Sequence, residues 1–223
     1  YDFESKHFRK GKPDDYISKC TNIDYIELKN NIHEKKIAEI NDFMYKLFPE
    51  QELRDYMWQH LASTLIGKNN DQTFNIYNGC GSNGKSKLVE LMSSCMGDYK
   101  ATVPITLITA KRNSIGSTSS EVVQLKGVRY AVMQEPSKGD KINEGIMKEI
   151  TGGDPLQGRA LFKDSVTFIP QFKLVVCTNT LLDVGSNDEG TWRRICVCEF
   201  KSKFKKLSDF EHDVEDNGIM QPY

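Results

Sequence analysis

No run of apolar residues in this 223-residue sequence approaches the length of about 18 that a membrane-spanning helix requires. A secretory signal peptide is also missing, so we expect an intracellular protein of the cytoplasm or nucleus. The chain lacks an excess of either charge, since 30 basic residues stand against 31 acidic ones. Any contact with nucleic acid must therefore be concentrated at a local site rather than spread over a basic surface.

The sequence also lacks any pair of cysteines with the CxxC spacing that is common in zinc sites. Most of its six cysteines stand among apolar neighbours; they are Cys20, Cys80, Cys95, Cys177, Cys196 and Cys198. This pattern favours buried free thiols over zinc ligands or disulfides.

The order of the expected helices and strands indicates an α/β fold. Residues 1–70 form an irregular and helical lead-in, with two amphipathic helices at about 37–48 and 53–65. Between residues 71 and 200, short β-rich runs alternate with helices, which is typical of a mostly parallel central sheet flanked by helices. We expect this part to be the catalytic core, and residues 201–223 to be a basic and then acidic tail or the start of a C-terminal segment.

A glycine-rich loop follows the first expected strand, at residues 73–77. The loop matches the pattern GxxxxGK[ST] and consists of Gly79, Cys80, Gly81, Ser82, Asn83, Gly84, Lys85 and Ser86. Glycines let backbone N–H groups point towards a phosphate, and the helix that follows adds the positive end of its dipole. We expect Lys85 to contact the β- and γ-phosphates of ATP and the Ser86 hydroxyl to bind Mg²⁺. A purely structural glycine turn is the alternative.

Two further expected strands end in polar residues that suit ATP hydrolysis. The apolar run at residues 128–133 leads to Gln134 and Glu135, and the Glu135 carboxylate could hold Mg²⁺ or polarise the attacking water. The run at residues 173–177 leads to Asn179, whose amide could orient that water or touch the γ-phosphate. A helix-capping glutamate and a turn-forming asparagine are the alternatives.

The pattern of residues 159–168 predicts a β-hairpin in which two strands meet at Lys163 and Asp164. A tip of this kind in the pore of a ring could bind DNA, with Lys163 at a phosphate and Phe162 packed on a sugar or base. The alternative is a surface hairpin with Phe162 in the core.

Two adjacent arginines, Arg193 and Arg194, precede the last expected strand, at residues 194–200. An arginine here could reach the γ-phosphate of a neighbouring subunit as an arginine finger, for which we choose Arg194 first and Arg193 second. A salt-bridged surface pair is the alternative.

Taken together, these residues resemble the superfamily 3 helicases, and among them the poxvirus-type primase-helicases of large nucleocytoplasmic DNA viruses and some phages and plasmids. The resemblance covers about residues 73–200, and residues 13–70 look like the helical domain that precedes the motor in that group. It implies a P-loop core of AAA+ type, a homo-oligomeric hexameric ring, ATP hydrolysis between subunits with Mg²⁺, and movement along single-stranded DNA in an infected host cell. Gln134 departs from members that carry paired acids, and a primase would lie in another part of the full-length chain.

Two other classes of function share parts of this pattern. A P-loop kinase of a small molecule also uses GxxxxGKS, but it needs an acceptor pocket and a lid for which the sequence gives no sign. An oligomeric DNA-binding module without hydrolysis would have no need of Lys85, Ser86, Glu135 and Asn179. The sequence therefore favours an ATP-dependent DNA helicase for viral or mobile-element replication.

Overall fold

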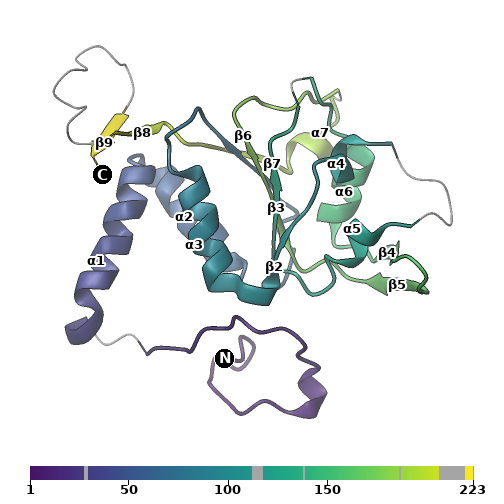
Figure 1. Ribbon diagram of the computed structural model, residues 1–223, viewed down its shortest axis with the longest axis horizontal. Helices are drawn as coiled ribbons and strands as arrows, with labels where there is room; N and C mark the ends of the chain where they lie inside the picture. The colour runs from purple at the N-terminus through teal and green to yellow at the C-terminus, as the bar shows by residue number, and fades with distance from the viewer. Residues whose placement is uncertain (28–29, 112–117, 138, 186, 206–218, 223) are drawn as a thin grey trace.

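A parallel sheet of five strands forms the centre of the chain in a computed structural model, which describes residues 1–27, 30–111, 118–137, 139–185, 187–205 and 219–222 (Figure 1). The strand order is β2-β3-β6-β1-β7, and every neighbouring pair is parallel. The strands are β1 (Phe74–Asn78), β2 (Lys100–Thr102), β3 (Tyr130–Gln134), β6 (Lys173–Thr178) and β7 (Ile195–Glu199). The mostly parallel α/β architecture predicted from the sequence is therefore confirmed.

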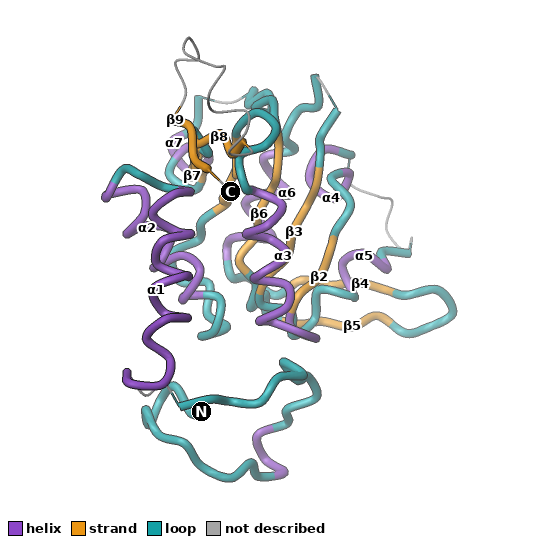
Figure 2. Tube along the Cα trace, turned by 60° about the vertical axis from the view of Figure 1, so that its left-hand side comes forward, coloured by secondary structure: helices purple, strands orange, loops and turns teal. Residues whose placement is uncertain are grey.

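Helices cover both faces of the sheet, so the molecule has three layers (Figures 1 and 2). One face is covered by α2 (Gln51–Ser63) and α3 (Lys85–Met96), and the C-terminal end of α1 (Asn30–Leu47) packs into the same core through Met44 and Leu47. The other is covered by the short helices α4 (Thr106–Thr109) and α5 (Ser120–Val123), by α6 (Glu144–Gly152), and by α7 (Glu189–Trp192), which contacts α6. None of the helices in the described ranges is long and apolar enough to span a lipid bilayer.

Each face of the sheet has its own apolar core, because successive residues of a strand point to opposite sides. In β1, Phe74 and Ile76 pack into the core that includes Met147 of α6. Tyr77, the next residue, packs into the core that includes Leu88 of α3. All of these side chains are almost fully buried, so the sheet is fixed between its two layers of helices.

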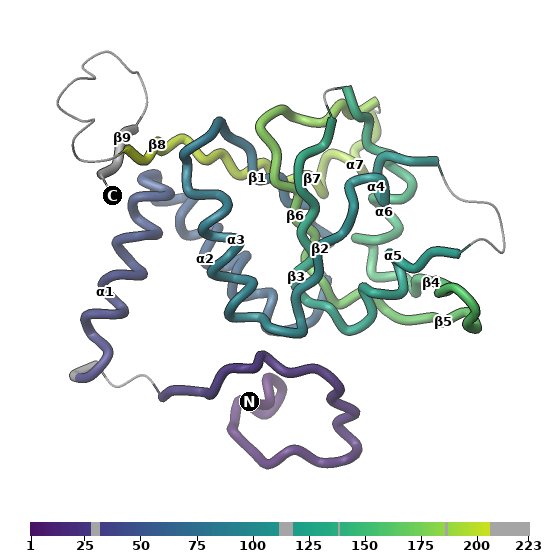
Figure 3. The backbone as a smooth tube through the Cα atoms, in the orientation of Figure 1, coloured from purple at the N-terminus to yellow at the C-terminus, as the bar shows by residue number. Residues whose placement is uncertain are grey.

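The N-terminal residues 1–27 lie beside the three layers, and their regular structure is one short 3-10 helix, η1 (Pro13–Asp15) (Figure 3). This segment is fastened to η2 (Gly97–Tyr99), because the Cys20 amide donates to Asp98 Oδ2 at 3.1 Å and the Tyr99 hydroxyl donates to the Lys19 carbonyl at 3.0 Å. The lead-in is thus irregular before α1, as expected, although α1 begins several residues earlier than its apolar pattern predicts.

Beyond the central sheet, β8 (Ser202–Lys205) pairs in parallel with β9 (Ile219–Pro222). The Phe204 amide donates to the Ser82 carbonyl at 2.7 Å, so the basic part of the expected tail is attached to the glycine-rich loop. The acidic stretch 209–216 lies outside the described residues. The division of the chain into three parts stays a prediction.

The expectation of buried thiols is wrong for three of the six cysteines, and two others, Cys177 and Cys196, are only partly buried. All six are free, but three of them, in the N-terminal segment, the glycine-rich loop and the last turn of α3, are exposed: Cys20, Cys80 and Cys95. The residues directly beside these three cysteines are mostly polar or glycine, so the local sequence provides little reason to expect burial there. Cys198 is buried in the core under α3, as expected.

Candidate active site

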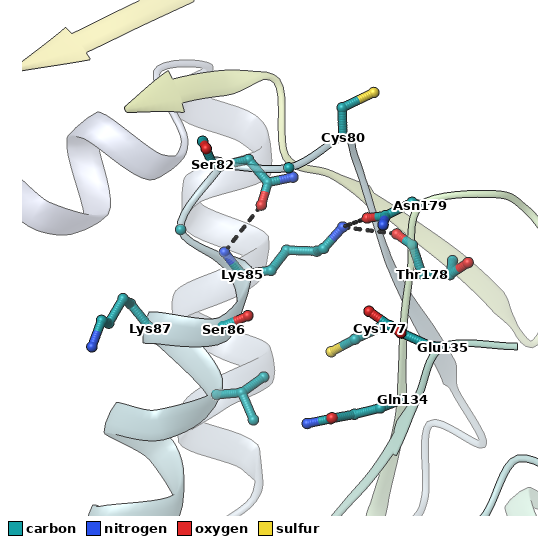
Figure 4. Close-up of a pocket in the computed structure, with 14 residues that line it drawn as sticks. Cys80, Ser82, Lys85, Ser86, Lys87, Gln134, Glu135, Cys177, Thr178 and Asn179 are labelled. Carbon is teal, nitrogen blue, oxygen red and sulfur yellow. Dashed lines mark hydrogen bonds between the residues drawn. The ribbon is translucent and has the colours of Figure 1, made fainter. Parts of the chain in front are cut away.

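The glycine-rich loop and the polar ends of two other strands meet at one edge of the sheet. Strands β3, β6 and β1 are adjacent and parallel, with Gln134 opposite Cys177 and Asn78 opposite Thr178. Their carboxyl ends, where α/β proteins commonly bind ligands, therefore lie side by side. They surround a cavity of about 400 Å³. Its lining consists of residues 80–87, Val89, Gln134, Glu135, Cys177, Thr178 and Asn179 (Figure 4).

Two glycines let the loop curl tightly around the start of α3. Gly84 has a φ angle of +82°, and a Cβ atom there would lie 2.4 Å from Cδ2 of Leu47. A Cβ atom at Gly79 would lie 2.6 Å from the carbonyl oxygen of Phe200. Because α3 begins at Lys85, its first backbone N–H groups have no partner within the helix, and residues 85–87 line the cavity. This is the arrangement that binds phosphate in other proteins.

Lys85 connects the loop to the end of β6. Its Nζ donates to the Thr178 carbonyl at 2.8 Å, to Asn179 Oδ1 at 2.9 Å and to the Gly79 carbonyl. The side chain is only 8% exposed, and burial lowers the pKa of the ammonium group from its usual value. All three acceptors are neutral, so an anion in the cavity would be a stronger partner for this cation.

Glu135 brings a carboxylate to the same cavity (Figure 4). Its amide donates to the Cys177 carbonyl at 3.0 Å, which continues the pairing of β3 with β6 by one residue. Its φ angle of +44° is unusual for a residue other than glycine and turns the chain sharply away from the strand. Among the residues that line the cavity, Glu135 is the only carboxylate. The residue before it, Gln134, is an exposed amide and does not provide a second acid.

The donors around the cavity fit a hydrated magnesium ion. The Ser86 hydroxyl comes from the first turn of α3, and Glu135 comes from the opposite wall (Figure 4). Within the described ranges, no group of three or more His, Cys, Asp or Glu side chains could hold a metal ion. Mg²⁺ commonly binds through one or two protein oxygens together with water and the substrate's phosphates, so this sparse set suits it.

Asn83 is a polar residue of the loop whose hydrogen bonds are incomplete. The side chain is 5% exposed, and its Oδ1 accepts from the Lys85 amide at 3.3 Å. Its buried Nδ2 has no hydrogen-bond partner among the described residues. A buried donor without a partner is costly, so a bound phosphate oxygen would relieve that cost.

The two arginines lie at the opposite edge of the sheet. Ile195 pairs with Phe74, so both arginines sit near the amino ends of the strands. The loop after Asn78 is about five residues further along, or about 16 Å at about 3.3 Å per residue. Neither arginine can therefore serve the cavity of its own chain.

Their environments differ. Arg194 is 9% exposed and donates to the Gly190 carbonyl at 2.5 Å, and burial, followed by the charge of Arg193, lowers its pKa. Arg193 is exposed, and its guanidinium donates to Gln72 Oε1 at 2.9 Å. Within the described part of the chain, neither forms an ion pair. Accessibility thus favours Arg193, whereas the sequence pattern favoured Arg194.

A β-hairpin is present where the sequence predicts one, although its turn is longer. Strands β4 (Leu156–Arg159) and β5 (Ser165–Phe168) are antiparallel and joined by residues 160–164. The expected first strand at 159–163 is wrong, because β4 ends at Arg159 and Phe162 has a φ angle of +58° that no strand can hold. Phe162 is 97% exposed, so its alternative placement in the core is also wrong. Lys163 is exposed beside it.

The structure thus unites some of the predicted residues and separates others. The glycine-rich loop, Glu135 and Asn179 share one cavity, whereas the arginine pair and the hairpin tip lie elsewhere. The sequence did not indicate Thr178, whose carbonyl accepts from Lys85; its position next to Asn179 was the one available signal.

Comparison with known proteins places these features in a family. Residues 77–194 match the family described as "Family of unknown function (DUF5906)". A protein of Acanthamoeba polyphaga mimivirus, provisionally named a helicase, is 41% identical over 98% of this chain and 23% of its own length. A provisionally named helicase of Invertebrate iridescent virus 3 is 34% identical over 98% of this chain and 24% of its own. A provisionally named primase of African swine fever virus is 26% identical over 76% of this chain and 18% of its own.

Among solved structures, the C-terminal region of NrS-1 has a similar fold. The TM-score is 0.53 at 15% sequence identity, over 72% of this chain and 37% of that one. The chain spans about a quarter of the length of the first two viral relatives, which are covered to 23% and 24%.

Proposed function

Because the chain belongs to the DUF5906 family, whose matched region contains the whole cavity edge described above, we propose that it is the ATP-hydrolysing motor of a superfamily 3 DNA helicase. One observation carries the proposal. Lys85, Glu135 and Asn179 come from three separate segments and converge on one cavity at the carboxyl ends of adjacent parallel strands. The provisional helicase and primase names of the viral relatives support a role in DNA replication.

The cavity suggests how each residue would act on ATP. The N–H groups of the loop and of the start of α3 bind the phosphates, and Lys85 exchanges its neutral acceptors for the β- and γ-phosphate oxygens. Asn179 loses Lys85 as a donor at the same moment, so its amide is released to contact the γ-phosphate or the attacking water. Glu135 polarises that water. Mg²⁺, when bound through Ser86 and the phosphates, would neutralise developing negative charge.

Two features outside the cavity support a ring. Arg193 lies too far from its own cavity but is exposed on the surface, so it would complete the cavity of a neighbouring subunit as an arginine finger. Heterologous contacts of this kind form a ring when the rotation between neighbouring subunits closes. We therefore propose a hexamer with single-stranded DNA in its pore, held by Lys163 and Phe162. A primase would belong to another part of the longer protein, in an infected cell.

The test is to measure ATP hydrolysis with and without single-stranded DNA. The wild type should hydrolyse ATP faster with DNA, and Glu135→Gln should bind ATP but hydrolyse it about 10²- to 10⁴-fold more slowly. Glu90→Gln, an exposed glutamate of α3, is the matched control.

Three results would contradict the proposal. Turnover that ignores DNA and depends on a small-molecule acceptor would indicate a kinase. DNA binding without turnover would indicate a module that does not hydrolyse ATP. Full activity of Glu135→Gln would remove this carboxylate from the mechanism.

A further inference from the structure

Gln72 touches both arginines and the end of α6 at once. We propose that it is a positioning residue, which aims the Arg193 guanidinium at the neighbouring subunit and links it to the DNA hairpin. The inference rests on the proposed function, since it concerns how the trans arginine is held. Gln72 lies just before β1, at the edge of the sheet opposite the cavity.

The two guanidinium groups share the single side-chain oxygen of Gln72. Arg193 donates to Gln72 Oε1 at 2.9 Å and Arg194 donates to the same atom at 3.0 Å. The two cations share one neutral oxygen and repel each other, and Asp188, the carboxylate whose charge acts on Arg194, is also paired with Lys148. An exposed cation in this state is suited to bind an anion from outside the chain.

The amide nitrogen of Gln72 makes the second half of the link. Its Nε2 donates to the Gly152 carbonyl at 3.0 Å, at the last residue of α6. The nearby Asn69 donates through Nδ2 to the Thr151 carbonyl at 3.1 Å, so two amide side chains hold the same helix end. After Gly153 the chain enters β4, the first strand of the hairpin, at Leu156. A displacement of the hairpin would therefore reach Gln72 through α6.

A second contact ties α6 to the segment that carries the arginines. Lys148 of α6 forms an ion pair with Asp188. Asp188 in turn caps α7, because its carboxylate accepts from the Thr191 amide at 3.1 Å. Since Arg193 follows α7 directly, α6 is joined to the arginine pair at its middle, through Lys148, and at its C-terminal end, through Gly152.

The backbone of Gln72 has a conformation that is uncommon for a residue other than glycine. Its φ angle of +53° lies in the left-handed region, where glycine or asparagine is usual. Its amide donates to the Asn69 carbonyl at 3.3 Å and closes the turn before β1. A long polar side chain in this conformation is explained by what its two ends contact.

Two substitutions separate these two ends. Gln72→Ala removes the oxygen that contacts the arginines and the amide that donates to the Gly152 carbonyl. Gln72→Glu keeps an oxygen for the arginines but loses the donor to the Gly152 carbonyl. We expect Gln72→Ala to lower kcat for DNA-stimulated ATP hydrolysis about tenfold, with KM for ATP unchanged, because the cavity of its own chain is intact. Gln72→Glu should lose most of the stimulation by DNA because it lacks the donor to the Gly152 carbonyl, and its carboxylate should also slow the rate without DNA by pairing with Arg193 in its own chain.

Steady-state ATPase assays of the assembled protein, with and without single-stranded DNA, give kcat, KM for ATP and the stimulation by DNA. Thermal melting of each variant is measured in parallel. Gln51→Ala, an exposed glutamine of α2, is the matched control, and Arg193→Ala is the reference for loss of the trans arginine.

If Gln72→Ala has the wild-type kcat while Arg193→Ala hydrolyses ATP slowly, the role of Gln72 is overturned and the proposed function still stands. Full activity of Arg193→Ala overturns both the trans arginine and its positioning residue. A rise of KM in Gln72→Ala would show a merely structural role and overturn the inference, and full stimulation by DNA in Gln72→Glu would overturn the link to the hairpin.

Discussion

Replacing Lys163 by alanine should weaken the binding of single-stranded DNA and flatten its dependence on salt. The side chain is exposed at the tip of the β4–β5 hairpin, where no core contact would be lost. The chain as a whole is nearly neutral, with 30 basic and 31 acidic residues, so a phosphate contact must come from such a local cation.

The size of the effect follows from counterion release. Each phosphate neutralised on a single strand contributes about 0.7 to the slope of log K against log salt, so six tips in a ring would contribute up to about 4. Between 50 and 200 mM salt, the wild type should then lose up to about two orders of magnitude more affinity than Lys163→Ala.

Phe162 offers a matched contrast on the same loop. Its ring is 97% exposed and could stack on a base, which is worth about 1–3 kcal/mol per base. Phe162→Ala should therefore weaken binding without a change in the salt slope, because stacking releases no counterion. Lys36→Ala, an exposed lysine of α1, is the control for loss of a charge elsewhere.

The assay is a titration of labelled single-stranded DNA at four or more salt concentrations, with ATPase in the absence of DNA measured in parallel. Equal slopes for wild type and Lys163→Ala would refute the reasoning and make the hairpin a structural element. If Lys36→Ala flattens the salt dependence of DNA binding as much as Lys163→Ala does, the DNA contact is not localised at the hairpin tip.

Further outcomes follow from the cavity and the core. Lys85→Ala should weaken ATP affinity by about 10- to 100-fold, the worth of one charge-assisted hydrogen bond, as measured by fluorescent-nucleotide binding. Gly84→Ala should destabilise the loop by at least about 1–2 kcal/mol and abolish ATP binding, because the new Cβ meets Leu47; unchanged melting and affinity would contradict this. Burial, followed by the charge of Lys173, lowers the pKa of His60 to about 4. Since the unfolded state then binds more protons, the unfolding free energy should fall by about 3 kcal/mol from pH 7 to pH 4, and this part of the fall should vanish in His60→Gln.

The sequence predicted the parts of the fold that are encoded locally. Four of the five central strands are apolar runs whose ends lie within about two residues of the expected ends, and the polar residue after each run marks the edge where the cavity forms. The short edge strand β2 was missed because three residues carry too little pattern. The assignment of individual site residues to ATP, magnesium and DNA stays a prediction.

Contacts between distant parts of the chain could not be read from the sequence. Gln72 and Arg193 are 121 residues apart, and no pattern in either segment predicts the hydrogen bond between them. Arg193 and Arg194 are adjacent residues of the same type, yet Arg193 is exposed and Arg194 is buried. His60 is buried, and its Nε2 has no hydrogen-bond partner among the described residues, which no local pattern in the sequence predicts.

The most direct test of a ring that hydrolyses ATP between subunits is to mix two inactive proteins. Lys85→Ala lacks a working cavity and Arg193→Ala lacks the trans arginine, so each should be nearly inactive alone. In an equal mixture, random neighbours place an intact cavity against an intact arginine at about a quarter of the interfaces, so up to about a quarter of the wild-type ATPase rate with single-stranded DNA should return. A mixture no more active than its two components, in rings shown to exchange subunits, would contradict the account.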